Sequence, residues 1–387
     1  MTNESSPLRV LMVAPRYPSY PQGGLAQHLY QVGRRLARAG VNLTILASDE
    51  SGQLPTSEEA EGIQIRRVQA WPSNKDYYFA PGIYSIITHG QWDLVHCQGY
   101  HSLVAPVAML AAWRAKMPYI LTIHSSGDVT RLRKALRGLH WMLLRPLIAR
   151  AQKLIAMSQF EVDFFPERWR IPVERFVIIP SGAMHLPEVS EEVGGATNGA
   201  NGCRLIVSIG RLERYKGHQR VIAALPKVLE QIPDARLRIV GVGPYKSALQ
   251  KMARKHGVAE RVEIGAVPIP PDDRDGMASL IAQADLVTLL SEHEALGMSV
   301  LEALALKRPV LVAGTSALQE FADRGLARAV SLKSTPEEVA AAVVDQLRHP
   351  MIPIDAKLPT WDDCVADLLA LYQSVARKPL RREMVLN

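Results

Sequence analysis

The chain alternates short apolar runs with stretches in which apolar residues recur at helical spacing. The first apolar run is residues 8–14, and after a glycine-bearing loop Leu25, Leu29, Val32 and Leu36 recur as in an amphipathic helix. Further buried strands are predicted at residues 41–47, 93–97, 119–123, 154–157 and 177–179. This alternation predicts a parallel sheet covered by helices.

A segment without periodicity separates this alternation from a second one. Residues 186–202 (LPEVSEEVGGATNGANG) are rich in glycine, asparagine and glutamate, which is typical of a linker. Strands are predicted again at residues 205–209, 237–240, 262–264, 286–290 and 310–313. The predicted organisation is therefore two doubly wound α/β domains, residues 1–185 and 203–358, with a final segment, residues 359–387, whose helix returns to the first domain.

Length and composition agree with two globular domains. The chain has 387 residues, 48% of them hydrophobic and 21% charged, and exceeds the usual size of one hydrophobic core. No window approaches the roughly 18 apolar residues of a membrane span, and residues 1–7 are polar and too short for a signal peptide, so we expect a cytoplasmic protein. Cys97, Cys203 and Cys364 stand far apart, which indicates reduced thiols and neither a disulfide framework nor a zinc site.

The formal charge of +7 lies entirely in the first half of the chain. Residues 1–185 contain 20 Lys and Arg against 13 Asp and Glu, whereas the remainder contains 25 of each. Within that half, residues 131–150 carry six basic residues and no acidic one. Leucines recur there at helical spacing, at Leu132, Leu136, Leu139, Leu143 and Leu147, although Pro146 should kink or interrupt the helix.

This basic amphipathic segment predicts reversible attachment to an anionic membrane surface. The alternative is that its leucines pack on the sheet while its arginines are solvated. Nucleic acid is not expected as a partner, because no aromatic-interleaved basic platform accompanies the charge.

Residues 208–217 (SIGRLERYKG) follow a predicted strand and open a helix. Arg211 and Lys216 are spaced so that both can reach one anion, and a diphosphate fits that arrangement. A glycosyl transfer from a nucleotide sugar needs such cations, because negative charge develops on the departing diphosphate. The alternative is that both are surface charges around the start of a helix.

Residues 291–303 (SEHEALGMSVLEA) also follow a predicted strand. Glu294 and Glu302 are separated by seven residues, and Gly297 opens the helix between them, whose N-terminal amides can bind an anion. Glu302 shares a helix face with Met298 and Ala305, so its carboxylate needs a partner, which sugar hydroxyls would supply. A capping or solvated glutamate is the alternative.

Several weaker patterns lie in a consistent order around these two segments. Gly23 and Gly24 follow the first strand and would allow close approach of the backbone to a ligand, although a simple turn also explains them. The other patterns are Asp93-Leu94-Val95-His96, Thr122-Ile123-His124, Val240-Gly241-Val242-Gly243-Pro244, and Trp361 before the last helix.

Together these segments resemble the retaining glycosyltransferase family 4, also called glycosyl transferases group 1, which has the GT-B fold. The resemblance covers nearly the whole chain and implies an interdomain cleft, with the acceptor bound by the first domain and a nucleotide diphosphate-sugar by the second. It implies that no cofactor or metal is required. It also implies a carbohydrate or lipid-linked acceptor, in bacterial-type polysaccharide, lipopolysaccharide or glycolipid biosynthesis.

The resemblance also implies roles for individual residues. Arg211 and Lys216 would bind the diphosphate, Glu294 and His124 would lie near the donor sugar, and Glu302 would bind the ribose. His28, His96 and His101 are interpreted instead as core histidines. The full donor-binding set is Gly23, Gly24, Gly210, Arg211, Lys216, Gly241, Gly243, Glu294, Leu296, Gly297, Met298, Ser299 and Glu302.

The chain departs from the family pattern at three places. The usual Glu-Gly-Phe-Gly is residues 294–297 (EALG), a later Gly-Gly loop is residues 314–317 (GTSA), and a common Asn-Gly is Ser181-Gly182. The donor base, donor sugar and acceptor therefore stay open. Two other functions also stay open. A nucleotide-sugar epimerase or phosphorylase is disfavoured by the family signature. A non-catalytic sugar-nucleotide-binding regulator is disfavoured because Arg211, Lys216, Glu294 and Glu302 are all present.

Overall fold

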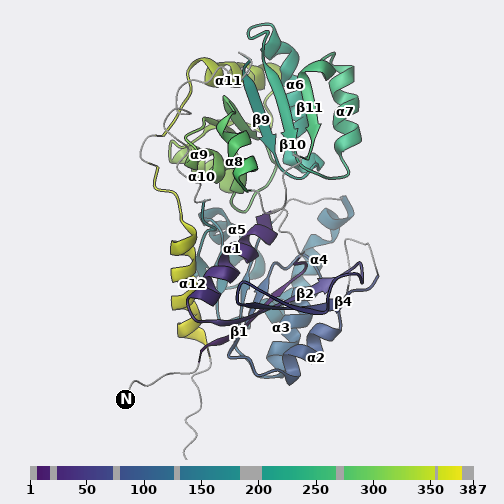
Figure 1. The fold of residues 1–387 in the computed structure, drawn as a ribbon, viewed down its shortest axis with the longest axis vertical. Helices are drawn as coiled ribbons and strands as arrows, with labels where there is room; N and C mark the ends of the chain where they lie inside the picture. The colour runs from purple at the N-terminus through teal and green to yellow at the C-terminus, as the bar shows by residue number, and fades with distance from the viewer. Residues whose placement is uncertain are drawn as a thin grey trace, which may run out of the picture.

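The computed structural model describes residues 7–17, 24–72, 79–125, 131–183, 203–266, 274–353 and 356–376, without the side chains of residues 131–137 and 274–275. The described chain forms two α/β domains, each built on one largely parallel sheet (Figure 1). The predicted doubly wound pair is confirmed. The predicted linker, residues 186–202, lies outside the described residues.

The N-terminal domain has an eight-stranded sheet of order β3-β4-β2-β1-β5-β6-β7-β8. Its pairs are parallel except for β3 with β4. The strands are β1 (Arg9–Ala14), β2 (Asn42–Asp49), β3 (Ser57–Ala60), β4 (Ile63–Gln69), β5 (Leu94–Gln98), β6 (Tyr119–Thr122), β7 (Leu154–Ala156) and β8 (Phe176–Ile178).

Alternation along β1 places side chains in two separate cores. Val10 and Met12 pack with one hydrophobic cluster, whereas Leu11 and Val13 pack with the other, as expected for a central strand covered on both faces. The first cluster lies under α1 (Gly24–Arg38) and the last helix of the chain, α12 (Trp361–Val375). The second lies under α2 (Gly82–His89), α3 (Val104–Arg114), α4 (Arg131–Ile148) and α5 (Gln159–Trp169).

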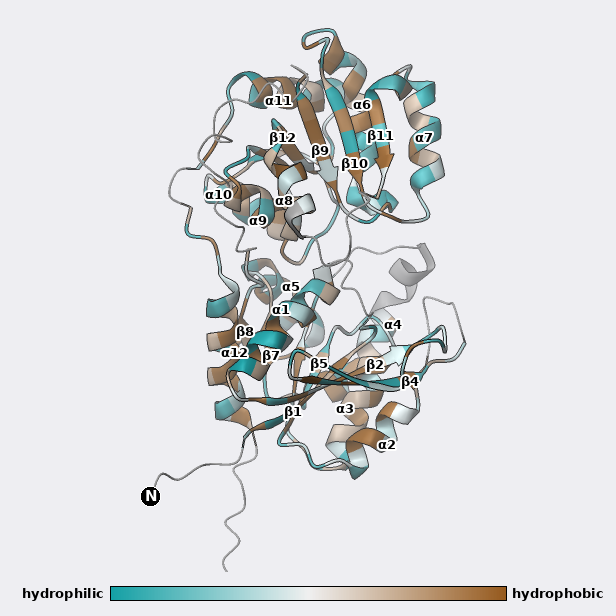
Figure 2. Cartoon of the chain, viewed as in Figure 1, coloured by the Kyte–Doolittle hydropathy of each residue, from teal (hydrophilic) through white to brown (hydrophobic). Residues whose placement is uncertain are grey.

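The C-terminal domain has a six-stranded parallel sheet of order β11-β10-β9-β12-β13-β14. Its strands are β9 (Leu205–Ile209), β10 (Arg236–Val240), β11 (Val262–Gly265), β12 (Leu286–Leu289), β13 (Val310–Ala313) and β14 (Arg328–Val330). Its helices are α6 (His218–Leu229), α7 (Lys246–Lys255), α8 (Arg274–Ala282), α9 (Met298–Ala305), α10 (Ser316–Asp323) and α11 (Pro336–Arg348). In both domains the apolar residues concentrate in the strands and the inner helix faces (Figure 2).

The last helix returns to the first domain, as predicted. Thr360 caps α12 by accepting the backbone N–H of Asp363, and Trp361 and Tyr372 are then buried against the N-terminal sheet. Where the chain leaves and re-enters this domain, the backbone N–H of Ala183 donates to the carbonyl of Pro359 at 2.7 Å. The two crossing segments thus lie side by side.

Three strands were not predicted, and one helix differs from expectation. β3 and β14 are edge strands and β4 is the neighbour of β3, and polar residues interrupt the apolar pattern in all three. Helix α4 continues through Pro146 to Ile148, so the proline lies in its last turn and does not interrupt it earlier. No helix in the described parts of the chain is long and apolar enough to span a bilayer.

Candidate active site

The loop between β9 and α6 carries the first predicted motif. It contains a short 3-10 turn, Arg214–Lys216, and Gly217, whose φ of 80° is left-handed. A Cβ at Gly217 would collide with the carbonyl oxygen of Leu290, which follows β12, so only glycine lets the two loops meet. The motif therefore packs directly against the second motif.

Lys216 and Glu294 form an ion pair where these loops meet. The Lys216 ammonium lies 2.6 Å from Oε1 of Glu294, and the two side chains are only 15% and 13% exposed. Burial alone would lower the pKa of Lys216, but the Glu294 carboxylate and Tyr215 hold that pKa above its usual value. Lys216 is therefore charged at neutral pH. Its partner, Glu294, is the residue expected near the donor sugar.

Glu294 is held by two serines in addition to Lys216. The hydroxyl of Ser291 donates to Oε1 of Glu294 at 2.7 Å, and the backbone N–H of Glu294 donates to the Ser316 hydroxyl at 2.9 Å. Ser316 has a left-handed φ of 49° and lies in the loop where the family usually has two glycines. The serine thus keeps a conformation that glycine favours and adds a hydrogen bond to the site.

Arg211 lies on the exposed side of the same loop. Its guanidinium pairs with Glu213 at 2.7 Å and donates to the Tyr215 hydroxyl at 2.8 Å, while its side chain stays 54% exposed. Burial opposes the charge, but Tyr215 and Glu213 outweigh it and raise the pKa of Arg211. The backbone of Arg211 is fixed by the buried His218, which donates to its carbonyl and accepts from Ser208; burial lowers the pKa of His218 to about 4.

Two further glycines in the predicted donor set have a packing reason. A Cβ on Gly241 would collide with the carbonyl of Gly210, and one on Gly243 would lie 2.5 Å from the carbonyl oxygen of Leu212. The loop after β10 can therefore lie flat on the loop after β9. Contact of these glycines with a donor stays a prediction.

Helix α9 presents the remaining donor residues. Gly297, with a left-handed φ of 92°, precedes the helix, and Met298, Glu302 and Ala305 all stay partly exposed, as expected for one shared face. Leu296 is also partly exposed, whereas Ser299 is buried. Gly24, at the start of α1, lies opposite this helix, since a Cβ there would be 3.7 Å from Met298; Gly23 lies outside the described residues.

His124 lies two residues after the end of β6, next to His28 of α1. Its φ of 48° is left-handed, and its Nε2 lies 2.7 Å from Oε1 of Gln98. Burial, with His28 and His96 nearby, lowers the pKa of His124 well below its usual value, so the ring is neutral. With Nε2–H donated to Gln98, Nδ1 is left as the acceptor nitrogen, suited to a hydroxyl donor.

His28 and His96 are core histidines, as interpreted from the sequence. His96 is fully buried between the Tyr372 hydroxyl, 2.7 Å from Nδ1, and the Thr122 hydroxyl, 2.6 Å from Nε2. His28 bonds the Ser181 hydroxyl through Nδ1 at 2.8 Å. His101, by contrast, is exposed and packs against the ring of Tyr100, so its assignment to the core is wrong.

Two family models match consecutive parts of the chain. The model for Glycosyltransferase Family 4 matches residues 22–183, and the model for Glycosyl transferases group 1 matches residues 196–353. Together they span both domains and every residue of the site. The chain belongs to the glycosyl transferases group 1 family.

Individual relatives and solved structures agree with this family. A D-inositol 3-phosphate glycosyltransferase of Nocardiopsis dassonvillei is 25% identical, covering 91% of this chain and 90% of its own. A glycogen synthase of Mycobacterium tuberculosis is 26% identical, and the match covers 89% of this chain and 87% of the synthase. Anabaena HepE, solved with UDP-glucose, shares the GT-B fold with a TM-score of 0.74 at 17% identity, covering 95% of this chain and 100% of its own.

The candidate site also contains residues that the sequence did not predict. Ser291, Ser316, Tyr215 and Gln98 each bond one of the predicted site residues directly. Ser316 carries the one available signal, because it occupies the loop in which the family places glycines. The others are common polar residues whose positions depend on how separate loops meet.

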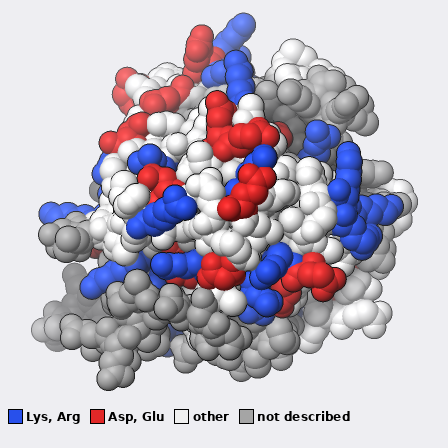
Figure 3. Space-filling model, turned by 90° about the horizontal axis from the view of Figure 1, so that it is seen from above, with Lys and Arg blue, Asp and Glu red and all other residues white. Residues whose placement is uncertain are grey.

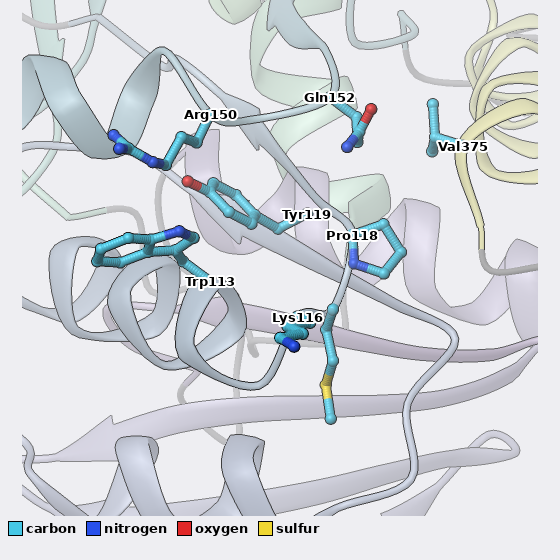
Figure 4. Close-up of a pocket in the computed structure, with 8 residues that line it drawn as sticks. Trp113, Lys116, Pro118, Tyr119, Arg150, Gln152 and Val375 are labelled. Atoms are coloured by element: carbon cyan, nitrogen blue, oxygen red, sulfur yellow. The ribbon is translucent and has the colours of Figure 1, made fainter.

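A surface cavity of about 480 Å³ lies away from this site, at the opposite end of β6 (Figure 4). Trp113, Tyr119, Arg150 and Gln152 line it together with Lys116. The Arg150 guanidinium lies over the Trp113 indole, 4.7 Å from the ring centre. This cavity contains none of the predicted donor residues.

Proposed function

We propose that this glycosyltransferase transfers a sugar from a nucleotide diphosphate-sugar to an acceptor hydroxyl with retention of configuration and without a metal. The observation that carries the proposal is the Lys216–Glu294 pair, which joins the expected diphosphate ligand to the residue expected at the sugar. Arg211, on the same loop, adds a second cation with an exposed guanidinium. Anabaena HepE, which binds UDP-glucose, supports a donor of this class.

The proposed chemistry needs no strong base from the protein. The bond between the anomeric carbon and the diphosphate oxygen breaks, the acceptor oxygen attacks from the same face, and the acceptor proton passes to the departing phosphate oxygen. Arg211, Lys216 and the amides at the start of α9 stabilise the charge that develops on the diphosphate. Glu294 orients the donor sugar, and the neutral Nδ1 of His124 accepts a sugar hydroxyl.

The test is a screen for release of nucleoside diphosphate from UDP-, GDP- and ADP-sugars, with and without candidate carbohydrate and lipid-linked acceptors, in EDTA. Transfer predicts release that rises with acceptor and a product whose anomeric configuration, read by NMR, equals that of the donor. An epimerase would convert the donor without release, and a regulator would bind without turnover. Inversion, or activity restored only by Mg²⁺ or Mn²⁺, would contradict the proposed mechanism.

A lipid-linked acceptor is favoured by the outer surface of α4. Leu144 and Ile148 are buried, in agreement with the alternative that the leucines of this segment pack on the sheet. Leu139, Met142 and Leu143, however, are 50%, 62% and 65% exposed. These three positions form one stripe at helical spacing. We propose that this stripe enters an anionic membrane reversibly and so brings the acceptor domain to lipid-bound acceptors.

A tryptophan and an arginine near the C-terminal end of α4 also suit an anionic membrane surface. Trp113, 42% exposed, lies beside the C-terminal end of α4 with Arg150 over its ring, and indole with arginine is a common combination at membrane interfaces (Figure 4). The end of the molecule formed by the C-terminal domain carries interspersed charges of both signs instead (Figure 3).

Vesicle sedimentation tests this part of the proposal. We expect salt-sensitive binding to vesicles with anionic lipid, weak binding to neutral vesicles, and loss of binding when Leu139, Met142 and Leu143 are changed to Ser. Ile352→Ser, which alters an exposed apolar residue of the other domain, is the matched control. Full recovery of the wild-type protein in the supernatant with anionic vesicles at low salt would reject membrane attachment.

A further inference from the structure

One hydrogen bond joins the two domains next to the reacting groups. Nε2 of His293, in the C-terminal domain, lies 3.1 Å from the hydroxyl of Ser125, in the N-terminal domain. Each partner is the immediate neighbour of a site residue, since Ser125 follows His124 and His293 precedes Glu294. Any movement at this contact therefore changes the distance between His124 and Glu294.

The N-terminal side of this contact is fixed by a buried carboxylate. Glu161, in the first turn of α5, is 0% exposed and accepts the backbone N–H groups of Ser125 at 2.8 Å and Met157 at 2.7 Å. Burial raises the pKa of Glu161, and the Ser125 side chain and the two backbone N–H groups oppose that shift. A hydroxyl oxygen can accept, so Nε2–H of His293 can donate to Ser125 across this 3.1 Å contact.

The surrounding contacts also connect the two domains. Phe160 packs edge-on against the His293 ring with 5.3 Å between centres. Ser158, at the N-cap of α5, makes no capping bond, and the carboxylate of Glu320 from α10 instead accepts the N–H of Phe160 at 2.6 Å. The first turn of α5 is thus capped by the other domain.

We infer that Ser125 and His293 are positioning residues whose hydrogen bond, held by Glu161, sets the separation of His124 and Glu294 across the two domains. The inference rests on the proposed transfer reaction, which requires groups from both domains at one sugar. A misplacement of about 1 Å can cost on the order of 100-fold in rate. The donor ligands Arg211 and Lys216 belong to one domain, so this bond governs turnover more than donor affinity.

The kinetic test is a double-mutant cycle on release of UDP from UDP-glucose. We expect Ser125→Ala and His293→Ala each to lower turnover by about 10- to 100-fold, and the double variant to be no slower than either one, since all three lack the same bond. His293→Gln restores a donor and should recover most of the rate. His256→Ala, which removes an exposed histidine of the same domain, is the control.

The affinity for UDP, measured by calorimetry, separates positioning from general damage. Positioning predicts a UDP Kd close to that of the wild type in all variants. Additive losses in the double variant, or a Kd that weakens in parallel with turnover, would overturn the inference. Failure of the wild type to bind any nucleoside diphosphate would instead count against the proposed function.

Distance measurement tests the contact without any substrate. Gln53 and Gln250 are exposed and lie in different domains, so spin labels on cysteines introduced at these two positions report the interdomain distance. Cys203 is changed to Ser to avoid labelling it, whereas Cys97 and Cys364 are buried. We expect one narrow distribution for the wild type and a broader one for Ser125→Ala and His293→Ala. Identical distributions would overturn the inference even if UDP-glucose is not the donor.

Discussion

At the scale of single residues, the candidate site contains a lysine, Lys216, that is largely buried and charged. Lys216→Ala removes a cation from the developing diphosphate charge, and we expect a loss of about 2–4 kcal/mol of transition-state stabilisation. Steady-state turnover measures it, with thermal unfolding to show that the variant is folded. Lys227→Ala, which breaks an exposed pair with Glu230, is the matched control; near-normal turnover in folded Lys216→Ala would refute the role of Lys216.

The two glutamates of the second motif should differ in their kinetic effects. Glu302→Gln is expected to raise the KM for the donor, because ribose binding is equal in ground and transition states, whereas Glu294→Gln should mainly lower kcat. Glu294→Gln also removes the partner of Lys216. Donor-dependent initial rates distinguish the two variants, and the reverse pattern would mean that their roles are exchanged.

At the scale of elements, α12 belongs to the N-terminal domain although it follows the C-terminal one. Tyr372→Phe removes the 2.7 Å hydrogen bond to Nδ1 of the buried His96 and leaves that atom only the longer contact with Nε2 of Gln98, at 3.4 Å, so the free energy of unfolding should fall by about 1–3 kcal/mol. Denaturant unfolding measures it. Tyr84→Phe, on the outer surface of α2, should change little, and equal stability of both variants would contradict the packing account.

The sequence predicted most elements because their patterns are local. Strands such as β1 and β12 are short, largely apolar runs followed by a loop and a helix, and the predicted ranges agree with them within a few residues. The strand β4 was missed because Arg66 and Arg67 interrupt its alternation, although Arg67 is itself buried and paired with Glu58. Local patterning does not reveal a charge that only its tertiary partners make tolerable.

The same distinction holds for the site. Arg211, Lys216, Glu294 and Glu302 lie in contiguous motifs and could be predicted from spacing and resemblance. The bond between Ser125 and His293 could not, because it joins residues 168 positions apart in different domains. Contacts of this kind follow from the way the two domains meet, which no motif encodes.

At the scale of the whole molecule, buried neutral histidines make stability depend on pH. Burial lowers the pKa of His28 and His218 to about 4 and that of His96 to about 3. Below the unfolded-state pKa of about 6.5 the unfolded chain binds more protons, so each such histidine reduces stability by up to about 1.4 kcal/mol per pH unit as the pH falls toward 4.

We therefore expect the free energy of unfolding to fall between pH 7 and pH 5. The slope of that free energy against pH counts the protons taken up on unfolding, and His218→Gln should lower the count by nearly one near pH 5, between the native and unfolded pKa values of this histidine. An unchanged slope in a folded His218→Gln variant would show that this histidine is protonated in the native protein.

The molecule as a whole has a basic N-terminal half and a charge-balanced C-terminal half. The central claim is that the C-terminal domain binds a nucleoside diphosphate through Arg211 and Lys216. Calorimetric titration of UDP, GDP and ADP, in EDTA, into the wild type and Lys216→Ala tests it most directly. We expect one nucleotide to bind the wild type and to bind Lys216→Ala at least about tenfold more weakly, as the loss of a charged hydrogen bond implies; equal binding to both proteins, or binding of none, would contradict the account.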